Sequence, residues 1–220
     1  MKASAIFVSF ALALMTGGIW FPIAALAQQS AGEPAYVEAS KLEAKGDFDG
    51  ARAKVTESLQ LDPNNLKARV LLGDLDAKKQ MWPEAEQDFQ AALKIDPANA
   101  FAKFDLAELQ LMQKRYADAR PGFNELTGDP QLGDFAAYKV FLCDLFAGNR
   151  EAAGHELEAF DQAQDKPSYY YANAASKLFD KKPDDAQSWL NTAANKYPPQ
   201  VNHNYLSTLS ELGYLPEPAK

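Results

Sequence analysis

Acidic side chains are the most numerous groups in this chain that could do chemistry, and their positions favour a structural role. Aspartates stand at Asp47, Asp62 and Asp96 and as the pair Asp184 and Asp185, next to glycines and prolines that end predicted helices. Catalytic acids need burial in a cleft to shift their pKa, whereas carboxylates at helix starts bind free backbone N–H groups. We therefore interpret these acids as helix caps and expect no catalytic residue among them.

Nucleophiles and metal ligands are scarce. The chain has one cysteine, Cys143, and two histidines, His155 and His203. A zinc site uses three or four such ligands, so we expect no metal site. Cys143 with His155 could act as nucleophile and base, which leaves a hydrolase as the weakest hypothesis, because Cys143 falls in an apolar stretch where cysteine packs as a small apolar side chain. Without a G-x-S-x-G motif or a glycine-rich phosphate loop, we expect no enzyme activity and no cofactor.

Residues 1–27 are typical of a secretory signal peptide. Lys2 is followed by an uncharged, mostly apolar stretch with an A-x-A end at Ala27. This pattern predicts cleavage between Ala27 and Gln28. The alternative is a retained membrane anchor, since the stretch is long enough to span a bilayer, although glycines and a proline interrupt it. We expect a periplasmic or secreted protein of bacterial type, with no stable membrane insertion after cleavage.

The bulk composition bounds the class of partner. The chain is 47% hydrophobic and 24% charged, as globular proteins are, and its net charge of −8 is acidic. An acidic surface repels nucleic-acid phosphates, so we expect no nucleic-acid partner. A lone cysteine allows no internal disulfide, so packing alone must hold the fold together.

Small and large residues recur along the chain with a constant period of 34. The sets that share this period are Ala39, Gly73 and Ala107; Ala51, Ala85 and Ala119; Val55, Phe89 and Phe123; and Pro63 and Pro97. A helix–turn–helix period of this length indicates a repeat array. Such an array is a one-dimensional stack with a concave surface, which favours a binding or assembly protein over an enzyme.

The second repeat, about residues 66–99, resembles the tetratricopeptide repeat family. The resemblance rests on Leu72, Gly73, Ala85, Phe89, Ala92 and Pro97. It implies an all-α fold, in which antiparallel helix pairs stack into a right-handed superhelix. We expect about five repeats and a C-terminal capping helix within residues 35–212, a flexible leader at 28–34 and a tail at 213–220.

One step in the array departs from the period. The step from Ala119 to Ala152 is one shorter than the period, and the step from Ala152 to Ala186 matches the period again. We therefore expect the register to slip by one residue between the third and fourth pairs.

In this family the first helix of each repeat lines the concave groove, and the matching positions give the partner-binding candidates. They are Lys67, Val70, Asp74, Phe101, Phe104, Glu108, Met112 and Tyr171. Apolar side chains with acidic neighbours suit a helix or an extended segment that has apolar anchors and some basic residues. The alternative is that Phe101, Phe104 and Tyr171 pack in the core and offer no free surface.

Two further features refine the prediction of a partner. One subgroup of the family binds the C-terminal carboxylates of chaperones and has asparagine at the positions of Asp74 and Glu108. We therefore expect this chain not to bind such carboxylates. The run Tyr169-Tyr170-Tyr171 is a second candidate contact patch, because three neighbours on a helix cannot all face the core. The alternative is that the run packs against the irregular fourth pair.

These patterns favour a non-enzymatic adaptor that binds a peptide or protein segment in a concave groove in the bacterial envelope. The alternative is a structural or assembly component of an envelope or secretion complex that uses its outer face. The sequence predicts neither the partner's identity nor the oligomeric state.

Overall fold

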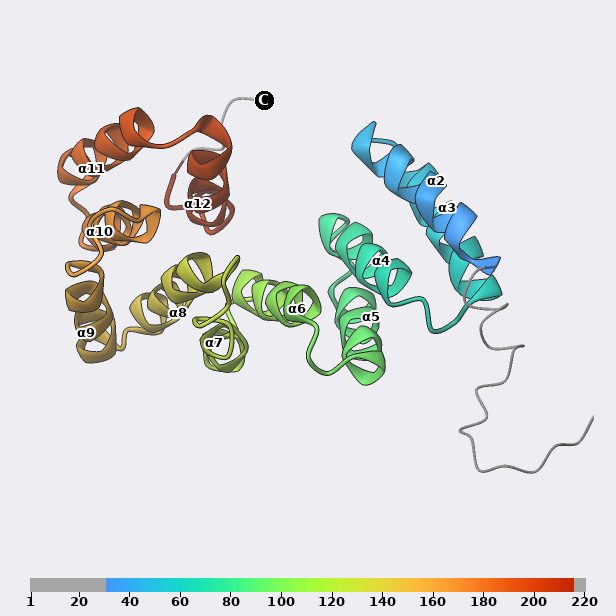
Figure 1. Ribbon diagram of the computed structural model, residues 1–220. Coiled ribbons are helices and arrows are strands. Elements are labelled where there is room, and N and C mark those ends of the chain that lie inside the picture. Colours follow the sequence, from blue (N-terminus) through green and yellow to red (C-terminus); the bar gives the residue numbers. More distant parts are fainter. Residues whose placement is uncertain (1–30, 216–220) are drawn as a thin grey trace, which may run out of the picture.

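The computed structural model describes residues 31–215, and every regular element among them is an α-helix (Figure 1). The helices are α2 (Glu33–Ala44), α3 (Phe48–Leu61), α4 (Leu66–Lys78), α5 (Trp82–Ile95), α6 (Ala100–Met112), α7 (Tyr116–Asn124), α8 (Gly133–Ala147), α9 (Arg150–Phe160), α10 (Pro167–Phe179), α11 (Pro183–Lys196) and α12 (Pro199–Glu211). From α2 to α11 they form five consecutive pairs, as expected for five repeats.

This range covers the predicted repeat domain and only parts of the predicted leader and tail. The predicted signal peptide and its cleavage site at Ala27 lie outside the described residues. The first helix begins at Glu33, two residues inside the segment expected to be a leader. Within residues 31–215, no helix combines the length and the apolar character that crossing a bilayer requires.

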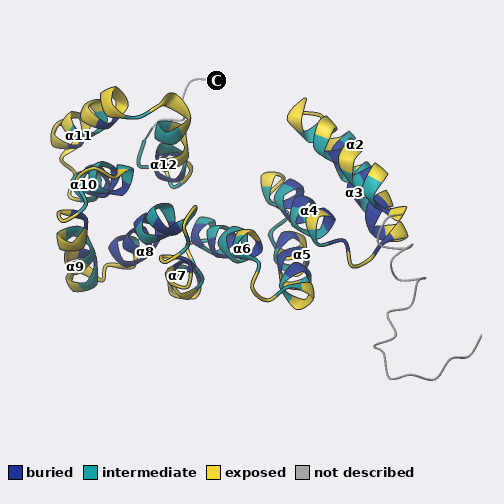
Figure 2. Ribbon diagram, viewed as in Figure 1, coloured by how far each residue is buried: buried dark blue, intermediate teal, exposed yellow. Residues whose placement is uncertain are grey.

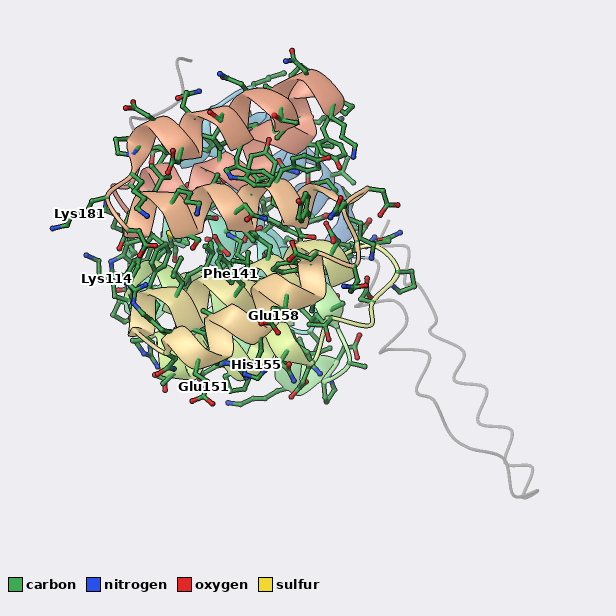
Figure 3. The ribbon with its side chains drawn as sticks, turned by 90° about the vertical axis from the view of Figure 1, so that its left-hand side faces the viewer. Lys114, Phe141, Glu151, His155, Glu158 and Lys181 are labelled. Carbon is green, nitrogen blue, oxygen red and sulfur yellow. The ribbon has the colours of Figure 1, made fainter. Side chains whose placement is uncertain are left out.

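A residue with left-handed backbone closes the turn inside each pair. Gly46, Gln80, Lys114, Gly148 and Lys181 all have φ between 58° and 80°. The first four follow one another at the period of the sequence, and the last step is one shorter. Because this backbone costs a non-glycine residue about 1–2 kcal/mol, the packed helices on either side must impose it. Figure 3 shows Lys114 and Lys181 at the same edge of the stack.

These turns correct the predicted register of the fourth pair. The small buried residue of each second helix follows the turn by five positions, and in the fourth pair it is Ala153, which is buried, and not Ala152. The step from Ala119 to Ala153 therefore keeps the full period, and the step from Ala153 to Ala186 is the shorter one. The predicted slip after the third pair was wrong, and it falls after the fourth. Two adjacent alanines cannot be told apart by residue type.

Small residues let the helices of the array approach closely. Ala39, Ala85 and Ala107 are buried, and a methyl group added at Gly73 would lie 2.6 Å from the ring of Phe89. Each such contact buries apolar surface of one helix against the next. The predicted all-α stack of repeats is therefore confirmed, including its small positions.

The interpretation of acids as helix caps is confirmed at the first helix boundary. The side chain of Asp47 accepts the backbone N–H of Gly50. Asp62 and Asp96 each accept the N–H two residues ahead, at 3.1 and 3.0 Å. Asp184 lies in the first turn of α11, where a carboxylate interacts favourably with the helix dipole.

The last helix lies on the inner side of the curve that α8, α10 and α11 describe (Figure 1). It packs on α10 and α11, the position expected of a capping helix, and its side chains also reach α8. The α8 helix packs against α7, α9 and α10 and is buried over most of its length, whereas α9 and α11 expose their outer faces (Figure 2).

Candidate functional site

A groove of about 280 Å³ opens between the first helices of the first three repeats. Its lining comes from α2, from α4 and from the start of α6. The lining residues are Tyr36, Ser40, Glu43, Leu66, Lys67, Val70, Leu71, Asp74, Asn99 and Phe101. We call this surface the open groove. It contains four of the predicted partner-binding candidates: Lys67, Val70, Asp74 and Phe101.

The three aromatic candidates are placed differently. The side chain of Phe101 is 56% exposed and stands at the open groove. Phe104 is half-buried, with its ring centroid 5.1 Å from that of Phe123 and 5.3 Å from that of Phe135. Tyr171 is 1% exposed. The core-packing alternative therefore describes Phe104 and Tyr171, and only Phe101 offers free surface.

Lys67 in the open groove and Lys78 on the same helix are already paired with groups of the first repeat. Lys67 Nζ lies 3.7 Å from a carboxylate oxygen of Glu33 and 5.8 Å from the ring centre of Tyr36. Lys78 Nζ donates to Glu43 Oε1 at 2.6 Å. These pairs hold α4 against α2 and leave the groove with little free positive charge.

Asp74, which lines the groove, and Asp105, which interacts with it electrostatically, lack such pairing. Asp74 and Asp105 have no hydrogen-bond or ion-pair partner within residues 31–215. Burial raises the pKa of Asp74 to about 7, and the charge of Glu43 adds to the rise while Lys78 opposes it. Burial likewise raises the pKa of Asp105 to about 8, with further increases from the charges of Asp74 and Glu108. A cation placed between these carboxylates would stabilise their ionised forms.

The remaining candidates on α6 face the later repeats. Glu108 Oε1 accepts a hydrogen bond of 2.6 Å from Lys139 Nζ on α8, and Lys139 is 1% exposed. Met112 is half-buried against the core cluster around Phe123. Glu108 and Met112 therefore connect α6 to α7 and α8 and lie outside the lining of the open groove.

Family comparison agrees with this architecture. Two family models described as tetratricopeptide repeat match the chain, one over residues 36–100 and the other over residues 79–139. The chain belongs to the tetratricopeptide repeat family. No curated protein matches this tetratricopeptide repeat protein in sequence.

Solved structures of the same fold cover most of the chain. PilF of Pseudomonas aeruginosa is 16% identical with a TM-score of 0.63, over 85% of this chain and 94% of PilF. YrrB, described as a tetratricopeptide repeat protein with an unusual peptide-binding site, is 18% identical with a TM-score of 0.58, over 85% and 97%. MamA of Desulfovibrio magneticus is 15% identical with a TM-score of 0.62, over 76% and 94%. At these identities the likeness shows the fold alone.

In this tetratricopeptide repeat protein, α12 covers the later part of the concave face. The hydroxyl of Tyr171 donates to Asn202 Oδ1 at 2.6 Å, and its ring stacks on Tyr205 at 4.9 Å between centroids. A partner can therefore reach Tyr171 only when α12 has moved away.

The tyrosine run on α10 divides between two surroundings. Tyr169 and Tyr170 are half-buried and pack edge-on against Trp189 of α11. Tyr170 also contacts the ring of Tyr197, at 5.8 Å between centroids. These two side chains mainly join α10 to α11, as the packing interpretation of the run predicts.

The structure gives the hydrolase hypothesis no support. Cys143 is 1% exposed among apolar side chains of α6, α7 and α8. Burial raises its pKa to about 12, so the reactive thiolate is scarce at neutral pH. His155 lies on the outward side of α9 (Figure 3) and has no hydrogen bond to Cys143. In the described part of the chain, no three metal-ligating side chains come together.

Two charged residues, the half-buried Asp105 and the buried Lys139, were missed by the sequence reasoning, although a signal for them exists. Asp105 and Lys139 stand one and two full periods after Leu71, which is 7% exposed in the second repeat. A charged residue at a repeat position that holds leucine elsewhere indicates a local departure from apolar packing. Applied to every position of the period, that rule would have singled out both residues.

Proposed function

We propose that this protein is an adaptor that binds a peptide or protein segment in the open groove. Tetratricopeptide repeats are protein-interaction scaffolds, and the open groove is the part of the concave face that α12 leaves uncovered. The observation that carries the proposal is the unpartnered carboxylate of Asp74, which lines the open groove together with the exposed ring of Phe101 and interacts with a second unpartnered carboxylate, that of Asp105.

The chemistry of the lining defines the ligand. A lysine or arginine side chain of the ligand would pair with Asp74 and Asp105, because an opposite charge removes the cost of ionising buried acids. An apolar side chain next to it would pack on Phe101 and Val70, since burying apolar surface is favourable. The ligand segment is therefore basic and apolar, as expected for an acidic protein.

Protons take part in this binding. With pKa values of about 7 for Asp74 and about 8 for Asp105, the free protein holds protons on these groups near neutral pH. A cationic ligand favours the ionised forms and expels those protons. Affinity should therefore rise as pH increases from about 6 to about 9, where a pair of ordinary aspartates would show no change.

We also propose that the adaptor works in the bacterial envelope. The support is the pattern of residues 1–27, with its charged start and its A-x-A end at Ala27. Mass measurement of the protein recovered from periplasm should give a chain that begins at Gln28. Recovery of the intact N-terminus in a membrane fraction would instead favour an anchor.

Selection from a random peptide library tests the binding proposal. Peptides enriched on the purified protein should carry lysine or arginine beside an aromatic or aliphatic residue. The affinity of one selected peptide is then measured by calorimetry on Phe101→Ala and on the double variant Asp74→Asn with Asp105→Asn. The matched control is Glu158→Gln, an amide exchange at an exposed residue of α9 (Figure 3).

The structure predicts distinct results for these variants. The double variant should weaken binding at least tenfold, because hydrogen bonds to charged groups contribute about 1.5–3 kcal/mol, and it should lose the pH dependence. Phe101→Ala should weaken binding several-fold, and Glu158→Gln should change nothing. Selected peptides without positive charge, or equal affinity for all variants, would refute the groove site. A defined assembly that co-purifies with every variant would instead support the outer-face alternative.

A further inference from the structure

A buried lysine on α8 shows how this array holds an ammonium group. Lys139 Nζ donates to Glu108 Oε1 on α6 at 2.6 Å and lies 4.8 Å from the ring centre of Phe135. The side chain of Lys139 is 1% exposed, and its Nζ also donates to Thr208 of α12. The charge is therefore held by a carboxylate on the neighbouring first helix and by an aromatic ring on its own helix.

The same positions recur one period earlier, with the lysine replaced. Ala102 on α6 and Ala136 on α8 are both fully buried and stand one period apart, which fixes the correspondence between the two helices. The carboxylate, the ring and the ammonium of the site on α8 therefore correspond to Asp74, Phe101 and Asp105. The acid and the ring are kept, and a second carboxylate replaces the ammonium.

The earlier copy of this site is open, whereas the later copy is covered. Asp74 and Phe101 both line the open groove, and Phe101 is 56% exposed. The ring of Phe135 instead packs against Tyr205 of α12, with 4.8 Å between the centroids. A ligand can therefore reach the carboxylate and the ring that correspond to those holding Lys139.

The junction between α4 and α6 also lacks a link that its neighbours have. Side chains tie α4 to α2, α8 to α6 and α10 to α8 through the pairs Lys78–Glu43, Lys139–Glu108 and Ser168–Asp134, each at 2.6 Å. Among residues 31–215, no side-chain hydrogen bond or ion pair joins α4 to α6. The charge of Asp74 instead raises the pKa of Asp105, because like charges repel. A cation from a ligand would supply the missing link.

We propose, on the basis of the function proposed above, that the basic residue of the ligand is a lysine whose ammonium lies over the ring of Phe101 and bonds to both Asp74 and Asp105. The ammonium takes the place that Lys139 Nζ takes beside Phe135. An ammonium is a compact charge with three donors, so it can bond to carboxylates on two helices at once. The planar guanidinium of arginine favours two-point pairing with a single carboxylate. The bound lysine thus links α4 to α6, and the site selects lysine over arginine.

Moving the lysine into the protein tests this geometry without a ligand. Asp105→Lys places a lysine on α6 at the position that Lys139 holds on α8, so its ammonium should bond to Asp74. Asp105→Asn, which only removes the charge, is the reference. The lysine variant should melt about 2–4 °C above the asparagine variant. This difference should vanish when Asp74→Asn is added to both variants.

The matched control makes the same exchange on the outer surface. Glu158→Lys and Glu158→Gln should melt alike, because Glu158 is exposed on α9 (Figure 3). Equal melting temperatures for Asp105→Lys and Asp105→Asn while Asp74 is present would overturn the proposal. If Asp105→Lys does not fold, the comparison of peptides on the unmodified protein decides.

That comparison uses one peptide selected from the random library. The peptide is synthesised with lysine, arginine or Nε-trimethyllysine at its basic position, and the three affinities are measured by calorimetry. Trimethyllysine keeps the charge and has no N–H donor, so its affinity reports the bonds to the carboxylates. The lysine peptide should bind at least fivefold more tightly than the other two. Asp105→Lys, whose own lysine fills the site, should bind it at least tenfold more weakly.

Different results distinguish this proposal from the proposed function. Equal affinity for the lysine and arginine peptides, with binding weakened in Asp74→Asn, would overturn the selection of lysine and leave the open groove as the binding site. Equal affinity for the lysine and trimethyllysine peptides would overturn the bonds to the two carboxylates. Failure of every basic peptide to bind would refute the proposed function and the lysine site with it.

Discussion

Replacing Gly73 by alanine tests the close approach of helices on which the whole stack depends. Its added methyl carbon would lie 2.6, 2.8 and 2.9 Å from three ring carbons of Phe89. Carbon atoms normally come no closer than about 3.5 Å, and Phe89 is 1% exposed, so its ring has little room to retreat. Overpacking of this kind costs about 1–3 kcal/mol.

A matched control separates this clash from helix propensity. Alanine in a helix interior is more favourable than glycine by about 1 kcal/mol. Gly154 lies inside α9, exposed, with nothing within 4 Å of an added methyl group. Gly154→Ala should therefore raise the free energy of unfolding by about 1 kcal/mol. Gly73→Ala has the same favourable propensity change but also the cost of overpacking, so it should lower the free energy of unfolding by up to about 2 kcal/mol.

Urea unfolding followed by circular dichroism measures both variants. The free energy of unfolding should be about 1–3 kcal/mol lower for Gly73→Ala than for Gly154→Ala. If the two variants are equally stable, Gly73 is not a close-approach position and the packing of α4 on α5 has been misread.

Three further predictions concern the turns, the core and the buried acids. Lys114→Gly should raise the free energy of unfolding by about 0.5–1 kcal/mol, since glycine removes the left-handed strain at some cost in chain entropy; an unchanged urea midpoint would contradict this. Ala85→Glu should lower the free energy of unfolding by about 3–5 kcal/mol, the cost of an unpaired charge at a fully buried site. A melting temperature within about one degree of the parent's would count against burial, because a loss of about 1 kcal/mol alone shifts the melting temperature by several degrees. The pKa values of Asp74 and Asp105 are raised from the unfolded value of 3.8 to about 7 and about 8, so the native state binds more protons than the unfolded state. The free energy of unfolding should therefore fall as pH rises from about 4 to about 8. Asp74→Asn should make that fall shallower in thermal melts, and a pH profile identical to the parent's would refute the assignment.

The sequence predicted the features that repeat. Small residues such as Gly73 and Ala107 repeat because every pair needs the same close contact, so their spacing reveals the array. The groove positions on α4 followed from that register, and Lys67 and Asp74 do line the open groove. The left-handed backbone at Gln80 and Lys114 was not predicted, because packing imposes it and it leaves no mark in residue type.

What does not repeat could not be predicted in this way. Phe101 and Phe104 are alike in sequence, and only the neighbouring helices decide that one is exposed and the other is packed. The docking of α12 on the inner face depends on contacts between distant residues, such as Tyr138 with Tyr205, 67 positions apart. No local pattern specifies such a pair, so Tyr171 was assigned to a free surface that α12 covers.

Locating a bound peptide on the protein tests the account most directly. Hydrogen exchange is measured with and without a saturating amount of a peptide selected from the random library, and the changes are mapped onto the helices. The account predicts slower exchange in α4 (residues 66–78) and at the start of α6, with no change in α9. Slower exchange confined to the outer helices, or none at all with a peptide that binds, would contradict the claim that the open groove is the binding site.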